Sequence, residues 1–137
     1  MIPKFRAWDR TRNEMNYKVM VGNCDLSDEN WTCPIIWIEE RKKWLHFDDD
    51  YECIMQSTGL RDKKGKEIFE GDILACETDD EVINLNVFWD EEHALFMFES
   101  KKYNEQELLA ELVENNTYPF EIIGNIYENP ELLEDKE

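Results

Sequence analysis

The residues that could carry chemistry in this chain are few and scattered. His46 and His93 are the only side chains whose unperturbed pKa lets them act as bases near neutral pH. Nucleophilic catalysis needs a hydroxyl or thiol beside such a base, and Ser57, Thr58 and the four cysteines are the nucleophiles we considered. His46 lies between apolar residues in W-L-H-F, and His93 lies in a predicted turn. We therefore expect no catalytic residue and interpret the chain as non-enzymatic.

Metal and cofactor sites are not predicted either. The cysteines stand at positions 24, 33, 53 and 76, without a C-x-x-C pair or a histidine at ligand spacing, which argues against zinc. The run Asp48–Asp50 with Glu52 lacks the spacing and central glycine of an EF-hand loop, so we interpret it as a solvated loop. Neither glycine-rich phosphate-binding motif is present. We expect no metal-binding and no cofactor-binding residue.

Basic residues interleaved with aromatic residues form the one pattern that suggests nucleic acid. The basic residues concerned are Lys4, Arg6, Arg10, Arg12, Arg41, Lys42 and Lys43. Charge on an edge strand, which discourages edge pairing, explains the same pattern. We prefer that explanation because the rest of the chain is so acidic, and we do not expect nucleic acid as a partner. Direct nucleic-acid binding stays our third hypothesis.

The negative charge of the chain is confined to its second half. Residues 1–66 contain 12 acidic and 12 basic side chains, whereas residues 67–137 contain 21 acidic and three basic ones, which accounts for the whole net charge of −18. An acidic surface repels a phosphate backbone and favours solubility. It can also imitate nucleic acid, so an acidic decoy that blocks a host nucleic-acid-binding protein is our second hypothesis.

Length and composition predict a folded chain with one domain, or one small domain with an appended subdomain. At 137 residues the chain can bury roughly two thirds of its extended surface. Its hydrophobic content of 42% and aromatic content of 12% favour folding despite the charge. No apolar run is long enough for a signal peptide or a membrane helix. We expect a cytoplasmic protein with free thiols and no membrane contact.

The stretch 55–72 organises the predicted fold. Its start alternates in polarity, which favours a short strand. Asp62 then begins a turn by bonding its own backbone, and Gly65 accepts the positive φ that the turn needs. Gly71 makes a second corner before an apolar strand over residues 73–76.

Apolar or alternating segments elsewhere predict further short strands. They cover residues 2–8, 14–21, 35–38, 44–47, 83–89, 94–98 and 121–126. Strands at this spacing indicate a small barrel or sandwich, and Gly124 marks a bulge or a close backbone approach. We predict a mostly β protein. Residues 1–53 form an N-terminal β-rich subdomain of hairpins with a loop over 22–34, and residues 54–137 form a small SH3-like β-barrel.

One amphipathic helix is predicted over residues 104–115. Asn104 suits the N-cap position, with Glu107 three residues later as in a capping box. The apolar stripe consists of Leu108, Leu109, Leu112 and Val113. We expect the stripe to pack on the core, with partner binding as the alternative. Asn129 and Pro130 predict the start of a second, short helix.

Three separated blocks of the sequence resemble one known family. Residues 56–73, Q-S-T-G-L-R-D-K-K-G-K-E-I-F-E-G-D-I, closely resemble the signature of the YopX-like proteins of phages and prophages. K-F-R-A-W-D at 4–9 resembles the opening of that family, and I-I-G-N-I-Y-E-N-P-E-L-L at 122–133 resembles its closing segment. The resemblance implies the SH3-like fold and a phage or prophage context. It implies no reaction, because the function of the family is uncharacterised.

Our leading hypothesis joins that resemblance to the lack of a recognisable catalytic site. It is a non-enzymatic phage or prophage accessory protein that acts through protein–protein contacts as a homo-oligomer. A host or phage protein is the further partner that we consider.

Overall fold

The structure is a computed structural model that describes residues 3–22, 33–39, 41–46, 53–115 and 119–134. Most of the loop predicted over residues 22–34 lies outside the described residues. The acidic run at 48–50, with Glu52, and the C-terminal tail from residue 135 lie outside them as well.

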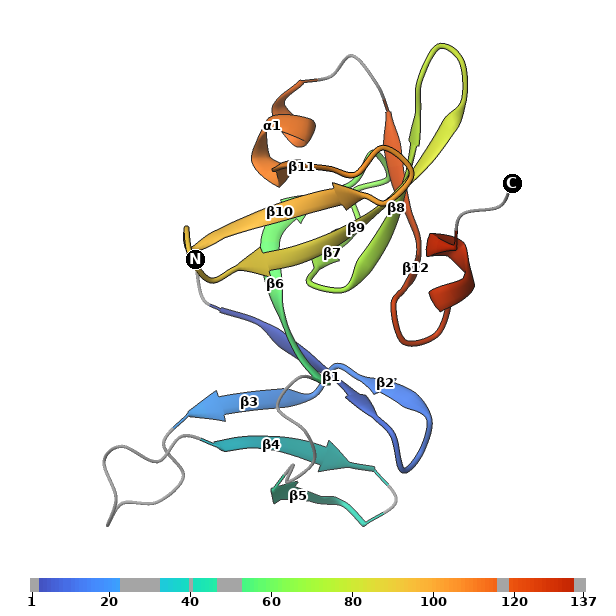
Figure 1. Cartoon of the computed structure of the whole chain (residues 1–137). Helices are drawn as coiled ribbons and strands as arrows, with labels where there is room; N and C mark the ends of the chain where they lie inside the picture. The colour runs from blue at the N-terminus through green and yellow to red at the C-terminus, as the bar shows by residue number, and fades with distance from the viewer. Residues whose placement is uncertain (1–2, 23–32, 40, 47–52, 116–118, 135–137) are drawn as a thin grey trace. The chain divides into compact units, whose positions relative to one another are not determined.

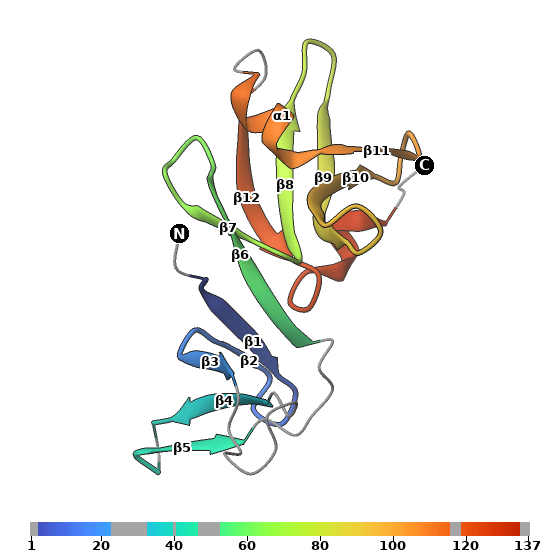
Figure 2. The same cartoon turned by 90° about the vertical axis from the view of Figure 1, so that its left-hand side faces the viewer.

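The described part of the chain is mostly β-structure with one short α-helix, which confirms the predicted fold class at that level. The strands are β1 (Phe5–Asp9), β2 (Glu14–Asn16), β3 (Val19–Gly22), β4 (Cys33–Ile38), β5 (Lys43–His46), β6 (Ile54–Arg61), β7 (Glu67–Phe69), β8 (Asp72–Glu77), β9 (Val82–Asp90), β10 (Leu95–Ser100), β11 (Glu105–Leu108) and β12 (Phe120–Asn125). The helices are α1 (Leu109–Glu114) and the 3-10 helix η2 (Pro130–Leu133). The strands form three antiparallel sheets, ordered β2-β1-β6-β7, β3-β4-β5 and β11-β10-β9-β8-β12 (Figures 1 and 2).

The chain divides into two compact units, Met1–Ser57 and Thr58–Glu137, which we call the N-terminal and the C-terminal unit. The division falls within β6. The first residues of β6 pair with β1 in the N-terminal unit. In the C-terminal unit, the Thr58 hydroxyl donates a hydrogen bond of 2.8 Å to the carbonyl oxygen of Ile68 on β7.

The strand predicted over residues 14–21 is wrong, because two strands of two different sheets cover it. β2 pairs with β1, as the predicted hairpin requires, whereas β3 pairs with β4. Asn16 bends the chain between them. Its side-chain oxygen accepts a hydrogen bond from the Lys18 N–H at 2.8 Å, and its amide donates to the carbonyl oxygen of Trp37 at 3.0 Å. An Asn that bonds the backbone two residues later favours a turn over a continuous strand.

The core of the C-terminal unit lies on one face of the five-stranded sheet. It consists of Ile68, Leu74, Cys76, Leu85, Val87, Phe98, Leu109 and Phe120. The predicted alternation of residues 83–89 places Leu85 and Val87 in this core. Trp89, at the end of that alternation, is 38% exposed.

The helix predicted over residues 104–115 is wrong in its first part. Asn104 has a φ of 52°, which ends a turn and excludes it from the N-cap position. Residues 105–108 form β11, which pairs with β10. Pairing with an existing strand satisfies the backbone groups of this segment and overrides its local helix signals. Helix α1 starts at Leu109 without a side-chain cap.

The predicted packing role of the apolar stripe is confirmed for its helical residues. Leu109 is fully buried, and Leu112 and Val113 pack against the core of the C-terminal unit. Leu108 belongs to β11, where it lies opposite Met97 of β10.

One carboxylate holds the turn between β6 and β7. Asp62 Oδ1 accepts hydrogen bonds from the N–H groups of Lys64 at 3.0 Å and Lys66 at 2.8 Å. Asp62 Oδ2 accepts a third from the Ile122 N–H at 3.0 Å. Gly65 has a φ of 81°, as the turn was predicted to need. The turn is therefore bonded both to itself and to β12.

The same turn covers the outer edge of β12. On one side β12 pairs with β8. On the other side the Lys63 N–H donates a hydrogen bond of 3.2 Å to the carbonyl oxygen of Phe120. Two residues later, the Ile122 N–H donates its hydrogen bond to Asp62. An open strand edge is a template for pairing with other chains, and this turn occupies that position.

Gly124 lies at a β-bulge, as predicted, because the pairing of β12 with β8 shifts between Ile122 and Gly124. A Cβ atom at this glycine would lie 2.4 Å from Asn129 Oδ1. That oxygen accepts a hydrogen bond from the Asn125 N–H at 3.3 Å. The short helix η2 begins as predicted, with Asn129 at the N-cap position and Pro130 in the first turn, but the Asn129 side chain does not bond the helix N–H groups as a cap would.

We expect Asp62→Ala to lower the free energy of unfolding by about 2 kcal/mol, because it leaves partly buried N–H groups without an acceptor. Burial disfavours the ionised carboxylate, but the N–H donors of Ile122, Lys66 and Lys64 outweigh it and lower the pKa of Asp62. A lowered pKa stabilises the fold above the unfolded-state value of about 3.9, and this contribution is lost as pH falls through the folded-state pKa. Denaturant unfolding at neutral and acid pH measures both effects.

Asp80→Ala is the matched control, since Asp80 is an exposed aspartate in another turn. We expect it to change stability by less than about 0.5 kcal/mol. Equal losses in the two variants would contradict the role of Asp62.

Candidate functional site

The sheet of the N-terminal unit formed by β3, β4 and β5 has one buried and one exposed face. Ile36 and Ile38 of β4 are buried. Trp37, between them, is only half-buried and lies opposite Trp44 of β5. The strand predicted over residues 35–38 is therefore confirmed, but its complete burial is wrong because Trp37 points away from the two isoleucines.

Large apolar side chains gather on the exposed face. The rings of Trp37 and Trp44 meet edge to face, with centroids 5.5 Å apart and planes at 66°. Trp44 is 41% exposed and Met20 of β3 is 50% exposed. Lys18 immediately precedes β3, and its ammonium lies 5.6 Å from the centre of the Trp37 ring. We call Lys18, Met20, Trp37 and Trp44 the aromatic face.

Glu39 lies at the border of this face and contacts two lysines. It forms an ion pair with Lys42 and accepts a hydrogen bond from Trp37 Nε1 at 2.6 Å. The Lys18 ammonium lies 3.8 Å from the same carboxylate. The hydrogen bond from Lys42 first, and then the one from Trp37, lower the pKa of Glu39 to about 2. The border therefore presents one anion between two exposed cations.

A groove with a volume of about 440 Å³ opens beside the Trp37 ring. Tyr17, which is 60% exposed, lines it together with Trp37. Arg12, Glu14, Lys18 and Glu39 supply charges of both signs along the groove. An aromatic wall with mixed charges around it suits a protein surface better than a single small anion.

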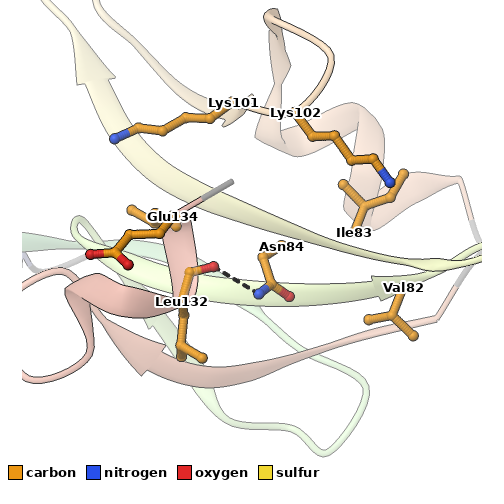
Figure 3. Close-up of a pocket in the computed structure, with 8 residues that line it drawn as sticks. Val82, Ile83, Asn84, Lys101, Lys102, Leu132 and Glu134 are labelled. Carbon is orange, nitrogen blue, oxygen red and sulfur yellow. Dashed lines mark hydrogen bonds between the residues drawn. The ribbon is translucent and has the colours of Figure 1, made fainter. Parts of the chain in front are cut away.

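A smaller pocket of about 150 Å³ lies in the C-terminal unit, where β9 meets η2 (Figure 3). Asn84 of β9 donates a hydrogen bond of 2.9 Å to the carbonyl oxygen of Leu132 in η2. Lys101 and Lys102, two of the three basic residues after position 66, line the pocket. Lys102 is held by an ion pair with Glu81. The hydrogen bond and the ion pair serve to join elements, so we do not take this pocket as the functional site.

Four of the predicted nucleophiles, Ser57, Thr58, Cys53 and Cys76, are buried, whereas Cys24 lies outside the described residues. Ser57 and Thr58 are buried in β6, and the Thr58 hydroxyl also accepts a hydrogen bond from the Leu60 N–H at 3.1 Å. Cys53 and Cys76 are buried and form no disulfide, and burial raises the pKa of Cys76. The described part of the chain contains no group of three or more His, Cys, Asp and Glu side chains that could hold a metal ion.

His93 and the predicted basic residues do not gather at one site. His93 is exposed in the turn after β9, where its Nδ1 lies 2.8 Å from Asp90 Oδ2. Arg6 is only 3% exposed, and Arg12 forms a 3.1 Å ion pair with Asp9. The predicted basic cluster is therefore not one free surface. Among the described residues, no helix is long and apolar enough to cross a membrane.

The family model described as YopX protein matches residues 4–134. The chain belongs to the YopX family. This match confirms the resemblance that the three sequence blocks predicted, and it covers the aromatic face, the Asp62 turn and the closing segment of this YopX-family protein.

Two solved structures share its fold over almost the whole chain. Protein EF1440 from Enterococcus faecalis is 29% identical, with a TM-score of 0.60, and the match covers 98% of this chain and 99% of that one. Protein yopX from Bacillus subtilis is 18% identical, with a TM-score of 0.63 and coverage of 96% and 98%. No curated protein matches this chain.

The charge cluster of this YopX-family protein can be tested by NMR titration of side-chain carboxyl carbons. We expect Glu39 to stay ionised at about pH 3.5, where a glutamate with the ordinary pKa of about 4.3 is mostly protonated. Lys42→Ala should raise the pKa of Glu39, because it removes the strongest of its partners. Lys43→Ala, which changes the adjacent exposed lysine, should leave that pKa unchanged. An ordinary pKa of Glu39 in the unaltered protein would contradict this cluster.

Proposed function

We propose that this YopX-family protein is a non-enzymatic phage or prophage accessory protein that acts through protein–protein contacts in the host cytoplasm, as a homo-oligomer. The aromatic face carries the proposal. Trp44 and Met20 remain substantially exposed beside a groove that is itself aromatic. Exposed apolar patches of this kind mark contact surfaces, and aromatic residues and Met are enriched at the centres of protein interfaces.

The positions of the reactive groups support a role without catalysis. Thr58 bonds backbone groups of the sheet, and Cys53 and Cys76 lie in the protein interior. His93 bonds a carboxylate in an exposed turn. Each of these side chains therefore has a structural role that accounts for its position. Buried, reduced thiols also agree with a cytoplasmic location.

We further propose that the five-stranded sheet of the C-terminal unit is an SH3-like barrel. The apolar core lies on one face of this sheet, and α1 packs against that core. The corner before β8 supports this proposal. Gly71 has a φ of 83°, and Asp72 accepts a hydrogen bond from the Phe69 N–H at 2.8 Å.

Gel filtration coupled to light scattering tests the oligomer. We expect a mass that is a multiple of 16.5 kDa at high protein concentration and that falls toward the single-chain value on dilution. A protein that stays at the mass of one chain at every concentration would rule out the homo-oligomer.

A second candidate function is the acidic decoy, which the confinement of the whole net charge to residues 67–137 favours. Exposed carboxylates of the C-terminal unit include Glu77, Asp79, Asp80, Glu91, Glu92, Glu105 and Glu107. If the decoy operates, a host protein captured from lysate should be displaced by added DNA. It should also bind a Glu91→Lys, Glu92→Lys variant more weakly. A captured protein that DNA leaves in place would argue against the decoy.

A further inference from the structure

We infer that the aromatic face is the surface on which a second copy of this chain docks, each copy presenting the same face to the other. This inference rests on the proposed homo-oligomer and names its contact surface. Three observations carry it: the distribution of charge along the chain, the mixed charges at the border of the face, and a second aromatic pair that differs in its surroundings.

The charge distribution restricts where two copies can meet. The C-terminal unit carries 22 acidic and seven basic side chains, so a contact between the C-terminal units of two chains brings two strongly negative surfaces together. Like charges that face each other across an interface disfavour association. The N-terminal unit carries 11 acidic and eight basic side chains, so its charges nearly balance. Self-contact through the N-terminal unit therefore avoids most of this repulsion.

The border of the aromatic face is complementary to itself. In a two-fold contact, residue i of one copy meets residue j of the other, and j meets i. Glu39 lies among Lys18 and Lys42, and all three side chains are largely exposed. The 3.8 Å contact of Lys18 with Glu39 is the looser of the two, so Lys18 can turn to Glu39 of the second copy. The exposed Trp44 ring of each copy then has an aromatic groove beside Trp37 available for packing.

A second exposed aromatic pair lies in the C-terminal unit and does not fit self-contact. Trp89 and Phe96 also meet edge to face, with ring centroids 4.8 Å apart and planes at 64°. Trp89 is 38% exposed, almost as much as Trp44. However, Asp90, Glu91 and Glu92 follow it directly in the sequence. The two pairs share geometry and exposure and differ in charge, which makes Trp89 a matched control.

The test compares Trp44→Glu with Trp89→Glu in the full chain by light scattering and sedimentation over a range of concentrations. We expect Trp44→Glu to weaken self-association at least tenfold and Trp89→Glu to leave it nearly unchanged. Thermal unfolding of both variants shows whether each is folded. If the unaltered protein is a monomer, the proposed homo-oligomer itself fails. If it associates and both variants associate equally, only the assignment of the face fails.

A charge exchange gives a test that does not depend on the tryptophan. Lys18→Glu alone and Glu39→Lys alone should each weaken self-association, because each places like charges opposite one another. An equimolar mixture of the two variants should restore it, since both contacts then join opposite charges. A mixture that stays dissociated overturns the two-fold arrangement. A Trp44→Glu chain that stays oligomeric but loses a host or phage protein assigns the face to that protein and overturns the inference.

Discussion

The Asp62 carboxylate joins a local turn to a strand 60 residues further along the chain, and the C-terminal unit depends on that connection. A carboxylate that accepts three backbone N–H groups stays ionised although it is buried. The Asp62 side chain thus orders the turn after β6 and accepts a hydrogen bond from the Ile122 N–H on the outer edge of β12. The apolar core can then form on one face of a sheet whose terminal strand is already covered.

The two units divide the surface properties of the protein between them. The C-terminal unit combines a covered strand edge with an acidic exterior, which favours a soluble body that resists association with like copies. The N-terminal unit exposes Trp44 and Met20 among charges of both signs. The proposed contact role would need one surface that repels indiscriminate partners and another that accepts a specific one. The division of charge along this chain is compatible with that role.

The sequence predicted the features that depend on neighbouring residues. Asp62 and Gly65 specify their turn through local bonding and a permitted φ, and Gly124 marks its bulge because it has no side chain. The family followed from three blocks of such residues. The helix predicted over residues 104–115 is wrong in its first part because residues 105–108 pair with β10 instead. Local capping signals do not encode such a contact. The strand over 14–21 failed because Asn16 bonds Lys18 and Trp37 rather than continuing the extended chain.

The candidate site was beyond the reach of local patterns. Residues 35–38 are uniformly apolar, so their sequence does not show that Trp37 faces outward while Ile36 and Ile38 face the interior. The partners that make the site, Lys18 and Trp44, come from two other segments and meet Trp37 only through sheet register. Their spacing in the sequence carries no signal of that meeting.

The place where the two units divide has a practical consequence. Independent domains are normally separated by an exposed linker, which can be cut without damage to either side. Here the division falls within a paired strand, β6, between Ser57 and Thr58. A gene truncated at that point would leave each fragment with an incomplete strand and new unpaired backbone groups. Dissecting the two halves of this protein therefore calls for surface substitutions in the intact chain rather than for expression of the separate pieces.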